Sequence, residues 1–154
     1  YLHFIFLLCL ISIISAYFIE YVLGHQPCNL CLIERIPYAL AIILIILHLT
    51  LSRNEKFLIL LLILIFFFSF LVSFYHFGIE QGFFEESVVC GLKNTSNIIS
   101  KEKLLEQLPP ISVSCKDVTF RIFGFSLTSV NIIISLIIVI ILLKIFKNYE
   151  KFKR

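Results

Sequence analysis

The sequence predicts an all-α membrane protein, a four-transmembrane-helix bundle with a long extracytoplasmic loop between helices 3 and 4. Composition favours this class, because 60% of the residues are hydrophobic and 15% are charged, against about 45–50% and about 25% in soluble domains. Length favours it as well, because four stretches lack Asp, Glu, Lys and Arg over at least 16 residues. In chain order these stretches are Phe4–Ile19, Ile36–Leu51, Phe57–Tyr75 and Phe125–Leu143.

The first two stretches hold 16 residues each and need flanking residues to cross a bilayer, whose hydrocarbon core takes about 20 residues of helix. The first extends to about Leu23 and so includes Glu20, and the second begins near residue 32 and so includes Glu34 and Arg35. The first stretch is also short enough for a secretory signal. We favour an uncleaved span, because no small-x-small cleavage site separates it from the cysteines that follow.

The last two stretches are 19 residues long, which is roughly 28 Å of helix and close to the hydrocarbon thickness of about 30 Å. The resulting prediction is a single integral membrane domain over residues 1–154. Its helices cover about 2–23, 32–51, 57–79 and 125–144, and its outer loops cover 24–31 and 80–124. In the long loop, the amphipathic pattern of residues 100–108 indicates a short helix that lies on the membrane surface or on the end of the bundle.

The distribution of Lys and Arg predicts the orientation, since cytoplasmic segments carry more of these residues. The tail 144–154 holds five of them, and the short turn 52–56 holds Arg53 and Lys56. The loop 80–124 holds five over 45 positions. We therefore expect both termini and the 52–56 turn in the cytoplasm, with both outer loops on the opposite side of the membrane.

The five cysteines divide by location. Cys9 lies within the first apolar stretch and is expected to be a small buried hydrophobe. Cys28 and Cys31 form a Cys-x-x-Cys at the head of the second helix, and Cys90 and Cys115 lie in the long outer loop. Cysteine pairs in an oxidising compartment form disulfides, so the sequence predicts two pairs and one separate thiol.

Three roles compete for these pairs. Structural disulfides are the usual role outside the cytoplasm. A tetrathiolate zinc site suits the Cys-x-x-Cys, but 24 residues lie between Cys90 and Cys115, and zinc also requires reduced thiols on the oxidising side, so we expect no metal. A redox relay is favoured, because a disulfide over two intervening residues closes almost no loop and stabilises the fold little.

The surroundings of the Cys-x-x-Cys favour a reactive thiolate. A helix N-terminus stabilises negative charge through its macrodipole and its free N–H groups. Arg35 follows Cys31 by four residues and Cys28 by seven, so that the three share one helix face. Pro37 then falls in the first turn of this helix or marks a kink in it.

The segment PCNLCLIERIPY, residues 27–38, resembles the Pro-Cys-x-Leu-Cys-x-x-x-Arg-x-Pro-Tyr signature of the DsbB family of bacterial inner-membrane, quinone-linked thiol oxidases. The segment FYHFGIEQGFFEESVVC, residues 74–90, is similar to the aromatic-His-x-Gly-x-Glu segment that leads to the third cysteine in the shorter members of the family. The resemblance covers residues 2 to about 144, including the helix count, the loop order and both cysteine pairs. One departure is Glu34, which stands where short members commonly have Gln. It predicts a carboxylate beside Arg35, where it tempers the positive field.

The resemblance implies a relay that passes electrons from a periplasmic thioredoxin-fold dithiol oxidase of the DsbA type to ubiquinone or menaquinone. Carried onto matching positions, it implies that Cys90 forms the mixed disulfide with the partner and that Cys115 exchanges with Cys28. Cys31 is then the thiolate that meets the quinone, and Arg35 lies beside that quinone. The resemblance also implies a multi-pass protein of the bacterial inner membrane with its cysteine loops in the periplasm.

Further ionisable residues near the outer face are candidates, since charge within a span is costly and often functional. Glu20 can pair with Arg35 or carry protons, although a carboxylate at the interface needs no partner. His76 is a candidate quinone contact or proton relay, and otherwise an interfacial aromatic beside Tyr75. His25 can tune thiolate formation, and the sequence assigns no role to Glu80.

Two alternatives remain open at this point. A relative of vitamin K epoxide reductase is also a quinone-linked helical bundle, but there the loop cysteines precede the Cys-x-x-Cys in sequence, opposite to the order here. A non-catalytic membrane scaffold with two inert disulfides needs neither quinone nor partner. The favoured interpretation is a protein-dithiol:quinone oxidoreductase with a thioredoxin-fold partner, embedded in membrane lipid, and we expect no nucleic-acid partner.

Overall fold

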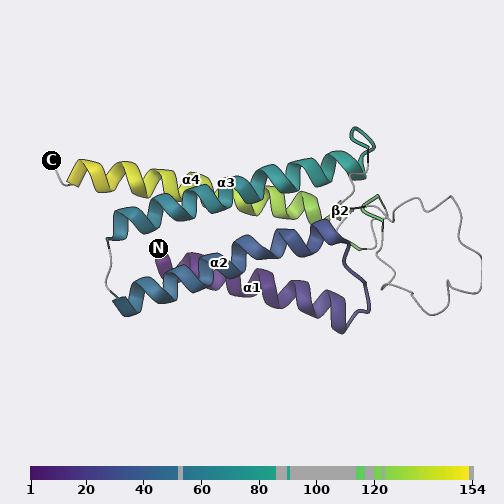
Figure 1. Cartoon of the computed structure of the whole chain (residues 1–154), viewed down its shortest axis with the longest axis horizontal. Coiled ribbons are helices and arrows are strands. Elements are labelled where there is room, and N and C mark those ends of the chain that lie inside the picture. The colour runs from purple at the N-terminus through teal and green to yellow at the C-terminus, as the bar shows by residue number, and fades with distance from the viewer. Residues whose placement is uncertain (52–53, 86–89, 91–113, 117–119, 123, 153–154) are drawn as a thin grey trace, which may run out of the picture.

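Four long helices dominate the structure, a computed structural model that describes residues 1–51, 54–85, 90, 114–116, 120–122 and 124–152 (Figure 1). In chain order the elements are α1 (Leu2–Tyr21), α2 (Asn29–Leu51), α3 (Glu55–Glu80), β1 (Arg121–Ile122), β2 (Phe125–Ser126) and α4 (Leu127–Phe152). The four helices are long and apolar enough to cross a membrane. They confirm the predicted fold class, an all-α four-helix membrane protein.

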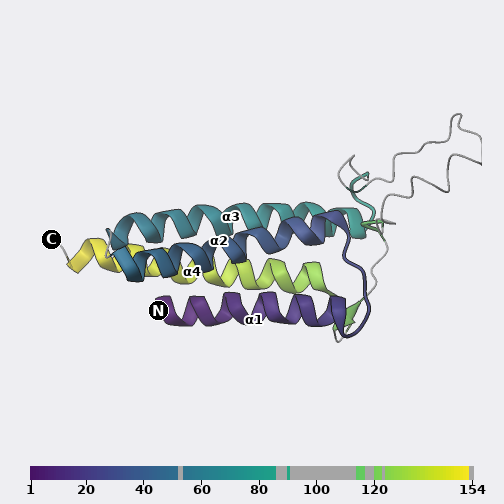
Figure 2. The ribbon, with the colours of Figure 1, turned by 60° about the horizontal axis from the view of Figure 1, so that its bottom comes forward.

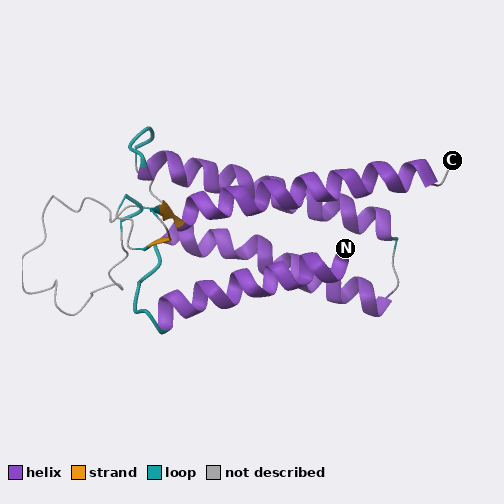
Figure 3. Cartoon of the chain, turned by 180° about the vertical axis from the view of Figure 1, so that it is seen from behind, coloured by secondary structure: helices purple, strands orange, loops and turns teal. Residues whose placement is uncertain are grey.

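The helices run alternately up and down, so that both termini lie at one end of the bundle (Figure 1). The α1–α2 connection and the two short strands lie at the other end, as the turned view also shows (Figure 2). Seen from behind, the strands lie beside the start of α4 (Figure 3). The α3–α4 pair makes the most extensive helix contact, and α2 packs against both α1 and α3. We call the end with the strands the outer end and the end with the termini the inner end.

An apolar cluster fills the inner part of the bundle. Its buried members, called the inner core below, are Ile5, Cys9, Tyr38, Ala41, Ile45, Leu58, Ile59, Leu62, Phe66, Ile138, Val139 and Leu142. Cys9 is fully buried among them, as expected for a small hydrophobe. Large apolar side chains such as Phe4, Ile43 and Phe67 point outward and are exposed. In a membrane these side chains face lipid, so the apolar length of each helix serves both the core and the bilayer.

The start of α2 places the Cys-x-x-Cys at the outer end. The helix begins at Asn29, three residues before the expected start, because the Cys28 carbonyl already accepts the N–H of Leu32 over 3.2 Å. Pro37 therefore lies inside α2 and not in its first turn. Since proline has no N–H, the carbonyl of Ile33 loses the helical hydrogen bond it would otherwise accept.

The end of α3 folds the chain back toward the cysteine loop. Gly82 has a φ of 76°, a left-handed conformation that glycine adopts without a steric cost and that commonly ends helices. The N–H of Phe83 then bonds back to the carbonyl of Gly78 over 2.8 Å. The Phe84 ring stacks on Tyr75 with centroids 5.6 Å apart. A Cβ at Gly78 would come within 2.2 Å of that ring, so a larger residue there would displace the Phe84 ring from Tyr75.

A short hairpin precedes α4. Arg121 pairs with Ser126, and Ile122 with Phe125. Since Phe125 and Ser126 belong to β2, α4 begins at Leu127, two residues after the expected start at 125. The remaining part of the long loop, including the expected amphipathic helix at 100–108, lies outside the described residues.

Candidate functional site: a row of four sulfurs beside a buried His–Glu pair

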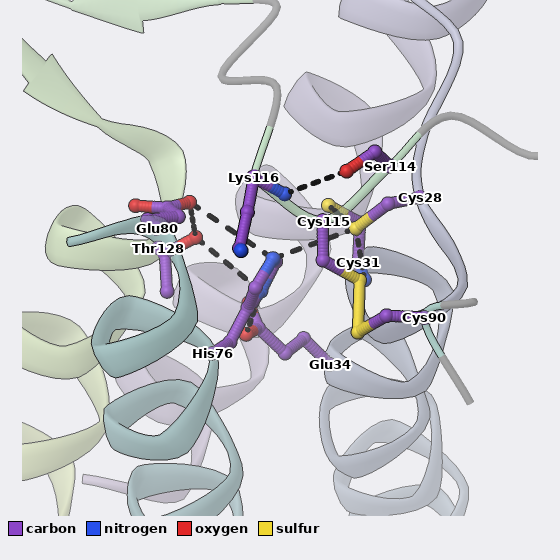
Figure 4. Close-up of a disulfide and its surroundings, with 10 residues drawn as sticks. All are labelled: Cys28, Cys31, Glu34, His76, Glu80, Cys90, Ser114, Cys115, Lys116 and Thr128. Atoms are coloured by element: carbon purple, nitrogen blue, oxygen red, sulfur yellow. Dashed lines mark hydrogen bonds and ion pairs between the residues drawn. A yellow bond between two sulfur atoms is a disulfide. The ribbon is translucent and has the colours of Figure 1, made fainter. Parts of the chain in front are cut away.

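Two pairs of cysteines meet at the outer end of the bundle (Figure 4). Cys90 and Cys115 form a disulfide with a Cα–Cα distance of 5.5 Å. Cys28 and Cys31 are free thiols whose sulfur atoms lie 2.8 Å apart. The buried residues that pack together here, called the outer cluster below, are Cys28, Leu30, Ile79, Cys90 and Cys115.

The two pairs lie within reach of each other. The sulfurs of Cys28 and Cys115 and a ring nitrogen of His76 all lie within 4.8 Å of one another. Thiol–disulfide exchange proceeds by attack of a thiolate on a disulfide sulfur, so a small approach brings Cys28 and Cys115 together. Donors so placed could also hold a metal ion, but structural zinc sites take four ligands and thiolate sulfur, and Cys115 is bonded to Cys90. The arrangement suits disulfide exchange better than zinc binding.

Cys28 lies just before α2 and caps its N-terminus. Its sulfur accepts the backbone N–H of Cys31 over 3.2 Å. Hydrogen bonding from the Cys31 thiol, with a smaller contribution from His76, outweighs burial and lowers the pKa of Cys28 from 9.0 to about 4. The resemblance implies a thiolate on Cys31 when electrons leave the protein. In the reduced pair described here, the helix cap and His76 both favour negative charge on Cys28, because both act on that sulfur.

His76 is buried between Cys28 and Glu34, with only 1% of the residue exposed. Nε2 lies 3.5 Å from the Cys28 sulfur, and Nδ1 lies 2.8 Å from Oε1 of Glu34. The residue is therefore not an interfacial aromatic. The expectation that the Glu34 carboxylate lies beside Arg35 is also corrected: Glu34 turns toward His76 on α3, whereas Arg35 points to Glu20 on α1. Consecutive helical residues project about 100° apart, so the two side chains face different helices.

Asn131 on α4 satisfies the other oxygen of Glu34, and polar side chains of α2 and α3 hold Asn131 in place. The Asn131 amide donates to Oε2 of Glu34 over 3.0 Å and to the Ser73 hydroxyl over 2.7 Å. The Tyr38 hydroxyl donates to the Asn131 side-chain carbonyl. A buried carboxylate requires such partners, since an unpaired one is costly. Asn131 was not among the residues predicted from the sequence, although an Asn inside an apolar span is a signal for interhelical hydrogen bonding.

Glu80 approaches His76 from the outer side. Its Oε1 accepts a hydrogen bond from Thr128 on α4 and lies 3.9 Å from Nε2 of His76. The Thr128 hydroxyl lies 3.4 Å from Nδ1 of His76. Within the described part of the chain, Oε2 of Glu80 is buried without a partner. His76 is thus placed between two carboxylates that favour a positive charge on its ring.

Arg35 is held by α1. Its guanidinium forms an ion pair with Glu20 and lies over the Tyr17 ring, 5.0 Å from the centroid. Of the three interpretations given for Glu20, pairing with Arg35 is the one observed. Glu20, and not Glu34, is therefore the carboxylate that offsets the positive charge of Arg35.

Exposure distinguishes the four sulfurs. Cys28, Cys90 and Cys115 are 5%, 1% and 3% exposed, respectively. Cys31 is only partly buried. It is the cysteine of the site that is open to its surroundings, at the head of α2 where the helix meets the expected membrane boundary.

His25 is close to the cysteines in sequence but does not take part in the site. Its ring packs on Phe120, with centroids 5.1 Å apart. This contact ties the α1–α2 connection to the chain just before β1. No side-chain contact between His25 and Cys28 is found among the described residues.

A cavity of about 460 Å³ opens at the outer end between α3, α4 and the hairpin. Phe74 and Phe125 supply apolar wall, and Glu80 lies on its border. Cys31 and Arg35 do not line it. The expected quinone position beside Arg35 is therefore a different place from this cavity.

Comparisons with known proteins relate the chain to a family of disulfide bond formation proteins. The sequence model of a family described as disulfide bond formation protein DsbB matches residues 1–145. A protein of Rickettsia prowazekii (strain Madrid E), described as uncharacterized protein RP370, is 27% identical over 136 residues, which are 86% of this chain and 78% of that protein. No solved structure matches the chain.

Proposed function

This chain belongs to the DsbB family of disulfide bond formation proteins, and from that premise we propose that it is a quinone-dependent thiol oxidase that reoxidises a DsbA-like periplasmic dithiol oxidase. Family membership makes it an oxidoreductase of disulfide bond formation, and the four apolar helices make it a multi-pass membrane protein. The partner, the electron acceptor and the roles of the four cysteines are the parts that we propose.

The row of sulfurs is the observation that supports the proposal most directly. Cys90 and Cys115 are bonded, Cys28 lies within 4.8 Å of Cys115, and Cys31 lies 2.8 Å from Cys28. Inert disulfides of a scaffold gain nothing from such proximity. A relay needs it, because each exchange requires an attacking sulfur to reach the next disulfide.

The proposed order uses each sulfur once. A thiolate of the partner attacks Cys90, which breaks the Cys90–Cys115 bond and releases Cys115 as a thiolate. Cys115 attacks Cys28 of an oxidised Cys28–Cys31 pair, and Cys31 leaves as a thiolate. In the complete cycle the partner dithiol becomes a disulfide, and two electrons and two protons leave through the Cys28–Cys31 pair. Cys90 is 1% exposed, so the groups that cover it must move before the partner attacks.

Cys31 and Arg35 are the residues that fit a quinone, and a bound ubiquinone or menaquinone supplies the two-electron acceptor. Cys31 is the partly exposed sulfur, and the Arg35 guanidinium is a fixed donor for a quinone oxygen. Glu20 holds that guanidinium in place, and its carboxylate partly offsets the positive charge there. His76, the third expected quinone contact, directs its two ring nitrogens toward Cys28 and Glu34.

We further propose that the outer end faces the periplasm of a bacterial cell and that both termini are cytoplasmic. The Lys and Arg residues of the 144–154 tail and the 52–56 turn support this orientation. The positions of the termini at the end away from the cysteines agree with it (Figure 1). Such an orientation gives the Cys90–Cys115 pair access to periplasmic partners.

Quinone reduction by the purified full-length chain in lipid nanodiscs tests the proposal. Addition of a reduced DsbA-type protein should cause loss of the quinone absorbance, in proportion to the partner oxidised. Omission of the partner is the control. Absence of partner-dependent reduction with both ubiquinone and menaquinone analogues would leave the scaffold interpretation in place of the relay.

Trapping tests the assigned order of the cysteines. In the Cys115→Ala variant, Cys90 is left as a free thiol that can attack the disulfide of an oxidised partner, so incubation with that oxidised partner should accumulate a mixed disulfide through Cys90. Non-reducing electrophoresis and peptide mass spectrometry identify the cysteine that is joined. Capture of the partner by Cys28 instead of Cys90 would overturn the order.

A further inference from the structure

The ring of His76 lies between the Glu34 carboxylate and the Cys28 sulfur (Figure 4). Nδ1 faces Oε1 of Glu34 over 2.8 Å, and Nε2 faces the Cys28 sulfur over 3.5 Å. All three residues are buried, with exposures of 1%, 8% and 5% for His76, Glu34 and Cys28. A ring that donates its Nδ1 proton to a carboxylate presents Nε2 to the group on its other side, which is the arrangement of nucleophile, base and orienting acid in acyl-transfer enzymes.

We propose that Cys28, His76 and Glu34 work as one unit in which His76 is a catalytic residue that exchanges a proton with the Cys28 sulfur and Glu34 is the positioning residue that orients and charges the imidazole. The catalytic role of His76 rests on the relay proposed above, because the relay supplies the disulfide exchange that His76 assists. It assigns His76 to the sulfur chemistry in place of the expected quinone contact.

The unit assists the step that re-forms the Cys90–Cys115 disulfide. When Cys115 is joined to Cys28, the Cys90 thiolate attacks the Cys115 sulfur; the Cys90–Cys115 bond forms, the Cys115–Cys28 bond breaks, and Cys28 leaves with the electron pair. No external oxidant or reductant is needed, because one disulfide replaces another. A leaving thiol of lower pKa leaves faster, and a proton donor on Nε2 stabilises the departing sulfur. The structure has Cys90 and Cys115 bonded and Cys28 free beside His76, which is the product side of this step.

The contact between His76 and Cys28 also favours exchange at the Cys28 sulfur over exchange at the Cys31 sulfur. Cys31 is partly exposed and has no histidine against its sulfur among the described residues, whereas Cys28 has the helix cap and His76. The anion that these contacts stabilise is that of Cys28, whose sulfur lies within 4.8 Å of the sulfur of Cys115. Exchange between the two pairs is thereby directed to Cys28.

Other groups also face His76 and bear on the pH dependence. From α3, Oε1 of Glu80 lies 3.9 Å from Nε2, and from α4 the neutral Thr128 hydroxyl lies 3.4 Å from Nδ1. The Lys116 side chain, beside Cys115, points toward this region in Figure 4. Glu34 has the closest carboxylate and a second oxygen fixed by Asn131. It is therefore the carboxylate whose removal should change the Cys28 titration most.

The pH profile of Cys28 alkylation measures the unit without partner or quinone. The full-length chain carries Cys9→Ala and Cys31→Ser, so that Cys28 is the remaining thiol of the Cys-x-x-Cys. It is reduced and treated with iodoacetamide from pH 3 upward. Peptide mass spectrometry then follows Cys28. The substitution His76→Gln should raise the pH midpoint of Cys28 alkylation by about one unit or more, because the thiolate loses the nearby positive charge of the imidazole. Glu34→Gln should raise it in the same direction by less, and the control His25→Gln should leave it unchanged.

An unchanged midpoint in folded His76→Gln overturns the proposal. If His76→Gln is not recovered in a folded form, Glu34→Gln decides alone, since its amide can still bond to the ring: a raised midpoint supports the unit and an unchanged one rejects it. In the quinone assay, His76→Gln should lower kcat and leave the KM for quinone unchanged. A raised KM with an unchanged Cys28 midpoint would return His76 to the quinone site. Because the alkylation needs no acceptor, failure of the relay and failure of the unit give different results.

Discussion

The inner core and the outer cluster are both buried, but they are built from different chemistry. In the inner core, Phe66, Leu62 and Ile45 are fully buried and pack against other apolar side chains. In the outer cluster, buried cysteines lie against an imidazole and a carboxylate from two helices. The inner core needs only volume and hydrophobicity, whereas the outer cluster needs particular atoms at particular distances. Burial therefore serves stability at the inner end and reactivity at the outer end.

The largest expected contrast comes from the same substitution at the two ends. Cys28→Ala should reduce partner-dependent quinone reduction to the uncatalysed background, because it removes the sulfur that lies within 4.8 Å of Cys115 and the Cys28–Cys31 disulfide can no longer form. Cys9→Ala, in the inner core, should leave turnover within about twofold and cost about 1 kcal/mol of stability. Quinone absorbance and thermal denaturation measure the two quantities. Equal loss of activity in both variants would contradict the division between the two regions.

The next effect is on stability and belongs to the inner core. Phe66→Ala removes a fully buried ring that meets Tyr38 edge-on, with centroids 5.6 Å apart. We expect a loss of about 3–5 kcal/mol in the free energy of unfolding, as for large-to-small core substitutions. The activity of the folded fraction should be retained. Phe67→Ala, on the exposed neighbour, is the matched control and should cost far less.

A smaller and more selective effect is expected at Arg35. Arg35→Ala should raise the apparent KM for quinone roughly tenfold or more, because a hydrogen bond to a charged group contributes about 1.5–3 kcal/mol. The free energy of unfolding should change little, since the ion pair with Glu20 is partly exposed. Steady-state quinone kinetics and denaturation separate the two effects. Glu20→Gln, which keeps the guanidinium, should not raise this KM, and unchanged quinone kinetics in Arg35→Ala would reject the role of Arg35.

Much of the site could be located from the sequence, but its internal contacts could not. The position of the Cys-x-x-Cys after the first apolar stretch and of Cys90 and Cys115 between the third and fourth stretches requires all four cysteines to lie at one end. The partners of Glu34 and Arg35 were different from those expected. The sequence placed the two side chains next to each other, but adjacent helical positions face different neighbours, so Glu34 reaches His76 and Arg35 reaches Glu20.

The sequence by itself determined the number of spans, their order and the end of the bundle that carries the cysteines, because hydrophobic length and chain connectivity decide these features. Only the tertiary structure decided which face of each helix meets its neighbours. Membrane helices are apolar on nearly every side, so no polar stripe marks the buried face. The contacts of His76 with Cys28 and Glu34, which are 48 and 42 positions away in the chain, follow from that packing.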